Sequence, residues 1–453
     1  MVAERLGDIA AGGHDPEAVL LRIRDQRFDQ LLRDTAPPQL RWCEGVVGDA
    51  HILPLRFAVA IPGQLGFRFA VGGAGDVATT QGLALALIFA ADGDGLIGHG
   101  EVSLKGGSLS LALNARGSTG VPMLFLSDNA ASVHPKVWEA MRAADGPDSP
   151  YDGDGHSQAL DEKFAATFGR DCTALWVATG TAANCLALAT MCQPHGGVVC
   201  HEEAHIEADE GGAPGFFLHG AKLLLVPGES AKLTPEAVRA AIDPIRDDVH
   251  QVQPHALSIT QASEYGVSYR PDEVAALIAL AKERGLGFHM DGARFANATA
   301  FLGCSPGEAA GPVDALSFGC VKNGGMSAEA ILFFDETLAD VAKYRRKRAG
   351  HLQSKGRFLA AQLHAMLDGD LWLENARGAN SAAAEIAASC GERLMHPVEA
   401  NELFVRLSPD ERESLRARGF EFYDWGADAA RFVTAWNTRE EDARALAEAI
   451  AAL

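Results

Sequence analysis

Lys322 could do chemistry, because it lies in the stretch SFGCVKNGG between two apolar runs. Lysine is rarely buried unless its charge is removed or paired. A lysine whose pKa is lowered by desolvation or by nearby cations can act as a nucleophile and form a Schiff base with a carbonyl compound. The small and glycine residues around it are typical of places where backbone approaches a ligand closely. The alternative is a solvated lysine in an ordinary turn.

Other stretches supply what pyridoxal phosphate, a carbonyl cofactor, requires beside such a lysine: a carboxylate for the ring nitrogen, a phosphate cradle and often a stacking ring. Asp291 in HMDGAR follows a strand-like run and could pair with the ring nitrogen. The stretch ATGTAAN (178–184) predicts a strand-to-helix turn, where free N–H groups and the helix dipole bind phosphate. His205 could stack on the ring. Singly, these could be a helix cap, a hydrogen-bonded core histidine and a plain turn; their order and strand-end placement favour a cofactor site.

A competing hypothesis rests on HEEAH, residues 201–205, which matches H-E-x-x-H. On a helix, its two histidines would share a face and could bind zinc, with Glu202 as general base. The motif instead follows the strand-like run GGVVC, and glycine and proline come soon after, which disfavours a long helix. Glu207, Asp209 and Glu210 offer third ligands without the usual spacing. We therefore expect no metal site here.

A third motif lies near the N-terminus. In FAVGGAGDVATT, Gly73, Gly75 and Ala78 fit G-x-G-x-x-A after an apolar run. A dinucleotide site also needs a complete βαβ unit and an acidic residue about 20 positions on. Asp92 and Asp94 are near that distance, but ADGDGLIGHGE reads as a turn-rich loop, so the pattern disfavours a nucleotide site.

The elements that would position Lys322 and Asp291 belong to a regular series after about residue 123. Strand-like runs such as ALWVAT, KLLLVPG and LGFHMDGAR alternate with helical patterns such as PDEVAALIALAKERG, which has proline at its first position and glycine after its last. This order predicts an α/β fold with a mainly parallel sheet flanked by helices. Both residues follow strand-like runs, so we expect them at the carboxyl ends of the strands, where ligands bind in such sheets.

The chain divides into three predicted parts. Residues 123–345 form the large domain, and residues 346–453 form connecting helices and a smaller α+β domain, with strands at ELFVRL and ARFVTAW and a closing helix at EEDARALAEAIAAL. Residues 1–122 have one brief helical pattern (16–32) and then glycine-rich stretches without clear rhythm. Their fold is uncertain; they are a disordered extension, or an upstream translation if the true start is Met123.

Composition narrows the class of protein. The formal net charge of -21 over 453 residues argues against nucleic acid or an anionic membrane as partner. The longest apolar stretch, LALALIFAA, is too short to span a bilayer, and the N-terminus lacks a signal-peptide pattern. Eight cysteines without paired short spacings do not suggest a disulfide framework. We expect a cytoplasmic protein.

From about Leu124 to the C-terminus the chain resembles the low-specificity L-threonine aldolases and the phenylserine aldolases. These are pyridoxal-phosphate enzymes of the β-eliminating lyase group, with the aspartate-aminotransferase-like fold. The matching stretches are LSDNAASVHP, GTAANCLAL, EEAHIEADEGGAPGF, ITQASEYG, HMDGARFANA, SFGCVKNGG and ARFVTAWNT. Jointly they are specific, and they say nothing about residues 1–122.

The resemblance implies an aldolase that cleaves threonine, allo-threonine or phenylserine to glycine and an aldehyde. It also implies a role for each matching position. Lys322 would form the Schiff base, Asp291 would pair with the ring nitrogen, and His205 would stack on the ring. The remaining positions would bind the cofactor phosphate through backbone (Gly180, Thr181) and the substrate carboxylate (Ser127, Arg294, Arg431). Family members are dimers or tetramers, so a homodimer or homotetramer is expected.

The chain departs from better-known members at two places. Glu264 occupies a position near which some aldolases carry a histidine, so the base for the β-hydroxyl could be His205, Glu264 or a bound water, and we favour His205. Gln353 stands where others have an arginine, so Lys355 or Arg357 could supply a phosphate contact across a subunit interface. Transamination or β-elimination on the same fold is the nearest rival reaction.

Overall fold

The computed structural model describes residues 122–453 and, before them, five strands; residues 1–40, 46–54, 60–83, 93–94, 105–106 and 114–121 are not described. The chain divides into two compact units, Met1–Val121 and Pro122–Leu453. In the first unit β1 (Arg41–Gly45) pairs antiparallel with β2 (Leu55–Val59). β3 (Ala84–Asp92), β4 (Gly95–Leu104) and β5 (Gly107–Leu113) form an antiparallel three-stranded sheet.

This N-terminal sheet corrects one prediction from the sequence. The pattern of ADGDGLIGHGE predicts a turn-rich loop, yet LIGHGE lies within β4, which pairs with a strand on each side. The glycines suggested a loop because local propensity carries no information about pairing on both edges. The G-x-G-x-x-A motif and the predicted helix at 16–32 lie outside the described residues.

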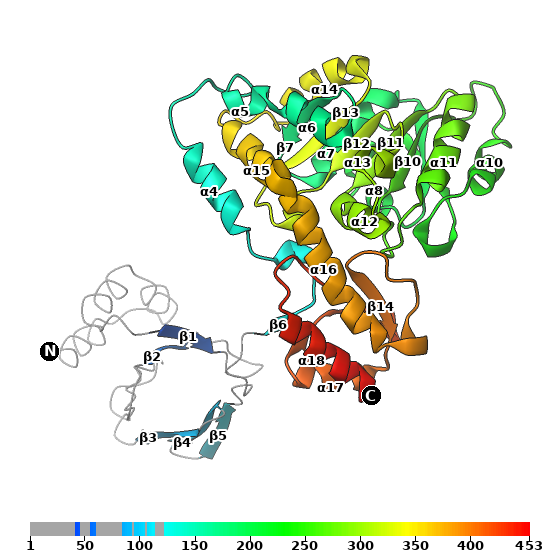
Figure 1. Cartoon of the computed structure of the whole chain (residues 1–453). Helices are drawn as coiled ribbons and strands as arrows, with labels where there is room; N and C mark the ends of the chain where they lie inside the picture. The colour runs from blue at the N-terminus through cyan, green and yellow to red at the C-terminus, as the bar shows by residue number, and fades with distance from the viewer. Residues whose placement is uncertain (1–40, 46–54, 60–83, 93–94, 105–106, 114–121) are drawn as a thin grey trace, which may run out of the picture. The chain divides into compact units, whose positions relative to one another are not determined.

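The second unit is built on a seven-stranded sheet with the order β7-β13-β12-β11-β10-β8-β9 (Figure 1). All neighbouring pairs are parallel except the two that β13 makes. The mostly parallel sheet predicted from the sequence is therefore confirmed. The strands are β7 (Thr173–Val177), β8 (Gly196–His201), β9 (Lys222–Val226), β10 (Gln253–Thr260), β11 (Gly287–Gly292), β12 (Ala315–Phe318) and β13 (Glu329–Phe333).

Helices cover both faces of this sheet, as strands buried on both sides require. Alternate residues of β7 show the two layers. Trp176 belongs to a core that includes Phe164 of α6 (Leu160–Phe168) and Leu277 of α11 (Pro271–Glu283). Leu175 packs in the opposite core with Leu186 of α7 (Gly180–Met191) and with α14 (Glu336–Arg348). The elements on these faces also include α10 (Pro235–Ile242), α12 (Phe295–Leu302) and α15 (Arg357–Leu367).

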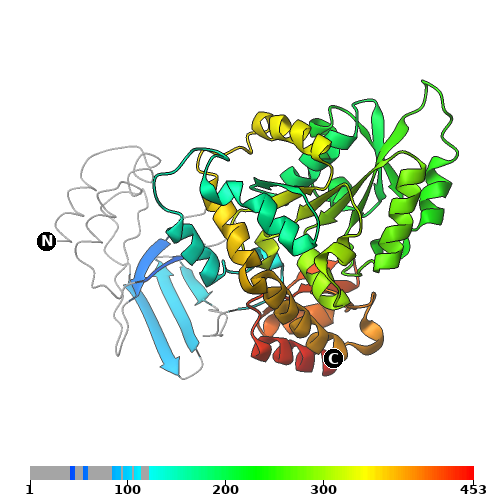
Figure 2. The same ribbon diagram turned by 45° about the horizontal axis from the view of Figure 1, so that its top comes forward.

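The C-terminal part carries its own core on a three-stranded antiparallel sheet of order β14-β17-β16, with bounds Glu402–Arg406, Ala429–Val433 and Tyr423–Trp425. α16 (Leu371–Ala388) leads into it, and α18 (Glu440–Ala451) packs along α16, as the red and orange helices show in both views (Figures 1 and 2). The strands and the closing helix were expected at these places.

The start of the second unit joins this C-terminal part. β6 (Met123–Leu124) pairs with β15 (Phe420–Glu421), and Phe125 packs in the core of the C-terminal part. The boundary predicted at residue 345 lies inside α14. In the parts of the chain that the structure describes, no helix combines the length and apolar character needed to cross a membrane.

Candidate active site

The predicted site residues gather at the carboxyl edge of the parallel strands. Asp291 is the last but one residue of β11 and lies opposite Ser317 of the parallel neighbour β12. Lys322 follows β12 on a short 3-10 turn, η4 (Val321–Asn323). The charge of Lys322 acts on the carboxyls of Asp128 and Glu264, which come from other segments. The strand-edge placement inferred from the sequence is therefore what the structure shows.

The loop of Lys322 differs from the expectation in two respects. The lysine is half-buried rather than well buried. The glycines around it serve the packing of the chain itself: a Cβ on Gly319 would lie 2.4 Å from the carbonyl oxygen of Ala293, and one on Gly325 would lie 2.6 Å from Cys320 Sγ. Gly324 has φ of 110°, which favours glycine. The close approach is to protein, and it fixes the path of the backbone that carries Lys322.

A buried carboxyl, Glu329, ties this loop to the sheet. Glu329 is the first residue of β13, and its Oε2 accepts hydrogen bonds from the backbone N–H groups of Cys320 and Val321. Burial raises the pKa of Glu329 to about 7, while the two N–H groups and the charge of Lys322 act in the opposite direction. Glu329 thus holds the two residues that precede the lysine.

Asp291 is held by a chain of side-chain hydrogen bonds. Asn184 of α7 donates through Nδ2 to Asp291 Oδ2, at 2.7 Å, and to Glu210 Oε1, at 2.9 Å. Glu210 Oε1 also lies 2.9 Å from Nδ1 of His205, the first residue of α8 (His205–Ala208). The backbone N–H of Ala293 donates to Asp291 Oδ1 at 2.9 Å. The structure therefore brings Asp291 and His205 into one network.

Glu264 approaches the same histidine from the loop after β10. Its Oε1 accepts a hydrogen bond from the backbone N–H of His205 at 3.2 Å. Burial raises the pKa of Glu264 to about 7, and the negative charge of Asp291 adds to this effect, whereas Lys322 opposes it. A carboxyl with such a pKa exchanges protons near neutral pH.

Two arginines and two carboxylates alternate beside the site. Arg294, buried after β11, donates to Asp128 through Nε at 2.7 Å and Nη2 at 2.9 Å, and its Nη1 lies 3.1 Å from Glu402 Oε2. Arg431 of β17 donates to Glu402 Oε1 at 2.7 and 3.2 Å. Ser127, the cap before Asp128, accepts a hydrogen bond from the N–H of residue 129. The residues expected to hold the substrate carboxylate are thus close together.

This arrangement also restricts what Arg294 can do. Three of its nitrogens already face carboxylates of the chain, whereas Arg431 directs two nitrogens to Glu402 and is less buried, with 20% of its side chain exposed against 6% for Arg294. Arg431 is therefore the more available of the two for an incoming anion.

Gly180 and Thr181 lie at the first two positions of α7, as expected. Thr179 caps the helix, and its hydroxyl accepts a hydrogen bond from the N–H of Ala182 at 3.2 Å. The first N–H groups of a helix have no partner within it, and the helix dipole favours an anion there. A Cβ on Gly180 would meet nothing within 4 Å, so space remains beside these donors.

The H-E-x-x-H motif does not form a metal-binding helix. His201 ends β8, and His205 begins the four-residue helix α8, so the two do not share a helical face. Both ring nitrogens of His201 are engaged, with the carbonyl oxygen of Gly228 at 3.0 Å and the N–H of Glu203 at 3.0 Å. Within residues 122–453, no group of three or more His, Cys, Asp or Glu is arranged to hold a metal.

The two basic residues named for a phosphate contact differ in position. Arg357 is buried and donates to the carbonyl oxygen of Ala144 at 3.0 Å, whereas Lys355 is exposed. Of this pair, Lys355 is thus the residue that a neighbouring molecule can reach.

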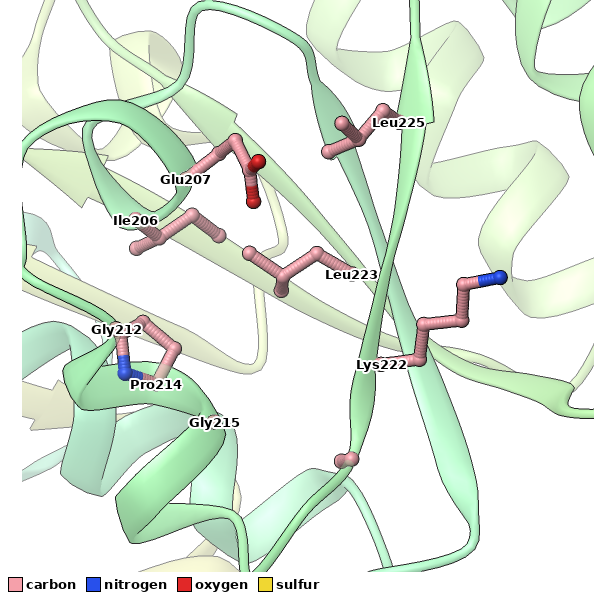
Figure 3. Close-up of a pocket in the computed structure, with 9 residues that line it drawn as sticks. Ile206, Glu207, Gly212, Pro214, Gly215, Lys222, Leu223 and Leu225 are labelled. Carbon is pink, nitrogen blue, oxygen red and sulfur yellow. The ribbon is translucent and has the colours of Figure 1, made fainter.

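A separate cleft of about 330 Å³ lies between α8, α9 (Ala213–Phe217) and the edge strand β9. Figure 3 shows Leu223 pointing toward Ile206 across this cleft, while Lys222 points to the other side of the strand. The lining is mostly aliphatic or glycine, with Glu207 as its acidic member. The cleft shares α8 with the site but holds none of the predicted site residues.

Sequence reasoning missed Asp128, Asn184 and Glu402 as residues of the site, and it considered Glu210 only as a possible zinc ligand. One signal could have found Glu402: it is a carboxylate at the start of an apolar strand, where a buried charge needs partners. Glu329 carries the same signal at the start of β13. Asp128, Asn184 and Glu210 lie in polar or small-residue stretches and carry no comparable pattern.

Comparison with known proteins identifies the family. The beta-eliminating lyase family model matches residues 125–409. The chain is 48% identical over 334 residues to a low specificity L-threonine aldolase of Pseudomonas aeruginosa, covering 72% of this chain and 96% of the relative, and 44% identical over 337 residues to one of a Pseudomonas species, covering 73% and 97%.

Solved structures agree with this assignment. A threonine aldolase of Leishmania major superimposes with a TM-score of 0.69 at 27% identity, covering 73% of this chain and 98% of that one. An aspartate aminotransferase of Rhodobacter sphaeroides, 17% identical with a TM-score of 0.57, shares the fold. The chain therefore belongs to the beta-eliminating lyase family, among the low-specificity L-threonine aldolases with the aspartate-aminotransferase-like fold.

Proposed function

We propose that this chain binds pyridoxal 5'-phosphate and cleaves the Cα–Cβ bond of L-β-hydroxy-α-amino acids to glycine and an aldehyde. The observation that carries the proposal is the meeting of Lys322, Asp291 and His205 at one edge of the sheet, in a chain that covers 96% of the length of an aldolase at 48% identity. Arg431, from the C-terminal sheet, is linked to this edge through Glu402 and Arg294. Threonine, allo-threonine and phenylserine form the proposed substrate class.

The residues present fit such a cofactor. Lys322 supplies the amine for covalent attachment, and Asp291 supplies a buried carboxylate for the ring nitrogen. Asn184, which orients Asp291, leaves its buried Oδ1 without a partner, as expected of a group that completes its hydrogen bonds with a ligand. The open space and free N–H groups at Gly180 and Thr181 suit the phosphate, and the half-buried His205 suits a stacking ring.

The chain's own residues would divide the remaining work. Arg431, with Arg294 and Ser127, would fix the substrate carboxylate and so set which bond faces the cofactor. When bound, the cofactor supplies a sink for the electron pair of the breaking bond. His205 would accept the proton of the β-hydroxyl through Nε2, since Nδ1 is engaged with Glu210. Glu264 would tune this histidine and is the second candidate for the base.

The proposal also covers the oligomeric state and the cellular location of the chain. We infer a homodimer or homotetramer, which light scattering of the purified chain would measure. A cytoplasmic location is supported by the seven cysteines among residues 122–453, which are all free thiols.

A visible absorption spectrum and product analysis test the function. We expect a band above 400 nm once pyridoxal phosphate is supplied, its loss on adding borohydride, and release of glycine and acetaldehyde from L-threonine. Lys322→Ala should abolish the band and nearly all turnover, while Lys282→Ala, at an exposed position of α11, serves as control for the spectrum. A chain that stays colourless with added cofactor would overturn the proposal, and a keto-acid product would assign transamination instead.

A further inference from the structure

The geometry points to Glu210 as a positioning residue for the reaction: it fixes the ring of His205 with Nε2 free for the substrate hydroxyl and, through Asn184, couples that ring to Asp291. The inference rests on the proposed aldol cleavage, because it deepens the role of the same site. Glu210 itself would touch neither substrate nor cofactor.

The position of Glu210 differs from that of the acids beside it. EADE contributes three acidic side chains, and Glu207 and Asp209 are exposed, whereas the side chain of Glu210 is 0% exposed. A carboxylate taken out of water needs hydrogen-bond donors on its oxygens. Glu210 is therefore held in the interior for its contacts and not as part of a solvated face.

All side-chain partners of Glu210 are compatible with donation to an anion. Asn184 Nδ2 lies 2.9 Å from Oε1, His205 Nδ1 lies 2.9 Å from the same oxygen, and Cys185 Sγ lies 3.7 Å from Oε2. Because an ionised carboxylate only accepts hydrogen bonds, His205 must carry its proton on Nδ1. In the neutral ring, Nε2 then keeps the lone pair that a general base needs.

Asn184 connects this pair to the residue proposed for the cofactor ring. Its amide nitrogen Nδ2 carries two hydrogens and donates to both Asp291 Oδ2 and Glu210 Oε1, with nitrogen–oxygen distances of 2.7 and 2.9 Å. One side chain therefore sets the distance between two carboxylates that would otherwise repel each other. Movement of Glu210 would disturb both the ring of His205 and the orientation of Asp291.

The electrostatics of His205 agree with this role. The hydrogen bond to Glu210 raises the pKa of His205, burial lowers it, and the remaining charges are Asp291 on β11 and Glu264 after β10, which raise it, and Lys322 on η4, which lowers it. Glu210 is the largest of these influences. It therefore stabilises the protonated ring that forms after the hydroxyl proton is taken.

Diethyl pyrocarbonate provides a test that does not depend on turnover, because it acylates neutral imidazole. Its reaction with His205 is followed by peptide mass spectrometry between pH 5 and 8 on the full chain without cofactor, in wild type, Glu210→Gln and Glu207→Gln. We expect the pH midpoint of His205 acylation to be about one unit lower in Glu210→Gln than in wild type, because the histidine loses a directly bonded charged partner. The exposed Glu207 lies two residues from His205 without contacting it, so its variant should keep the wild-type midpoint.

Steady-state kinetics of the cofactor-loaded protein then test whether the contact between Glu210 and His205 affects the reaction. In Glu210→Gln the acid limb of kcat/KM for L-threonine should move to lower pH together with the acylation midpoint, and kcat should fall about tenfold or more. Glu210→Asp keeps the charge at a greater distance and should recover part of both effects. It also provides the test if the glutamine variant does not fold.

The outcomes distinguish failure of the proposed role of Glu210 from failure of the proposed aldolase function. An unchanged acylation midpoint in a folded Glu210→Gln, or a shift in the aspartate variant as large as in the glutamine variant, would overturn the role of Glu210. Absence of aldolase turnover in cofactor-loaded wild type, with the midpoint shift intact, would overturn the proposed function and with it the catalytic part of this inference.

Discussion

Arg431 donates two hydrogen bonds to the buried carboxylate of Glu402, at 2.7 and 3.2 Å. The pair joins two neighbouring strands, since Arg431 lies on β17 and Glu402 on β14. Glu402 thereby holds the guanidinium in one orientation before any substrate arrives. An arginine held in this way loses less conformational entropy when it binds a carboxylate.

Arg431→Lys should therefore weaken substrate binding. Lysine keeps the charge but cannot reproduce the two-pronged geometry, and charge-assisted hydrogen bonds contribute about 1.5–3 kcal/mol each. We expect KM for L-threonine to rise roughly 10- to 100-fold with a smaller change in kcat. Arg439→Lys, an exposed change in the same part of the chain, should leave both constants unchanged. An unchanged KM in Arg431→Lys would remove this residue from the substrate site.

Glu402→Ala should lower stability more than any exposed substitution. Its carboxylate faces both Arg294 and Arg431, and 1% of its side chain is exposed. Removing one partner of a buried ion pair leaves an uncompensated charge, which costs about 3–5 kcal/mol. Chemical denaturation of the cofactor-free chain would measure this loss, with the exposed Glu440→Ala as control. A loss below about 1 kcal/mol would mean that water replaces the carboxylate.

Glu329 predicts a specific pH dependence of stability. Its folded-state pKa is about 7, above the ordinary value of 4.5, because the side chain is buried. Between these values the folded chain holds a proton that the unfolded chain has released, so this contribution to stability falls as pH rises from below 4.5 to above 7. The unfolding free energy of wild type relative to Glu329→Gln should drop by roughly 2–3 kcal/mol from pH 4.5 to pH 8.

Thermal and urea unfolding of both chains at several pH values would check this behaviour. Glutamine keeps one acceptor for the N–H groups of Cys320 and Val321 but does not titrate. The difference between the two chains therefore reports the protonation of Glu329 alone. Parallel pH curves for wild type and variant would contradict the raised pKa.

Much of the fold could be predicted because its signals are local. The helix at 271–283 begins at proline and ends before glycine, and β7 is an almost continuous apolar run, TALWV. The antiparallel direction of β13 and the pairing of β6 with β15 depend on contacts between distant segments. No local pattern encodes them.

The part of the site that could be predicted is the part that depends on the carboxyl ends of neighbouring parallel strands lying together. Lys322 and Asp291 meet because β11 and β12 are parallel neighbours. The engagement of Arg294 by Asp128 and Glu402 was not predictable, because it joins residues from three separate segments. Asp128 and Glu210 look like ordinary surface residues in the sequence, and only burial distinguishes them. Glu402 and Glu329 are marked by their position at the start of an apolar strand.

Gly319→Ala should disturb the loop of Lys322. The added Cβ would lie 2.4 Å from the carbonyl oxygen of Ala293, a backbone atom that cannot rotate away. Overpacking of this kind costs about 1–3 kcal/mol, and here it would also move the backbone that carries the lysine. Gly146→Ala, where the added carbon meets nothing within 4 Å, is the matched control. Unfolding free energies and cofactor affinity of both variants would measure the effect, and equal values would show that the loop adjusts freely.

Substitution of His205 and Glu264 should separate the two candidates for the base. Glu264→Gln keeps the acceptor for the N–H of His205 but removes a carboxyl with a pKa of about 7. If His205 takes the hydroxyl proton, His205→Asn should lower kcat by about 10²- to 10⁴-fold, the usual size of general-base catalysis, whereas Glu264→Gln should stay within about tenfold of wild type. The glutamine variant should also lose an inflection near pH 7 from its rate profile. A larger loss of kcat in Glu264→Gln than in His205→Asn would identify Glu264 as the proton acceptor. A carboxyl with a pKa near neutrality is itself well suited to that task.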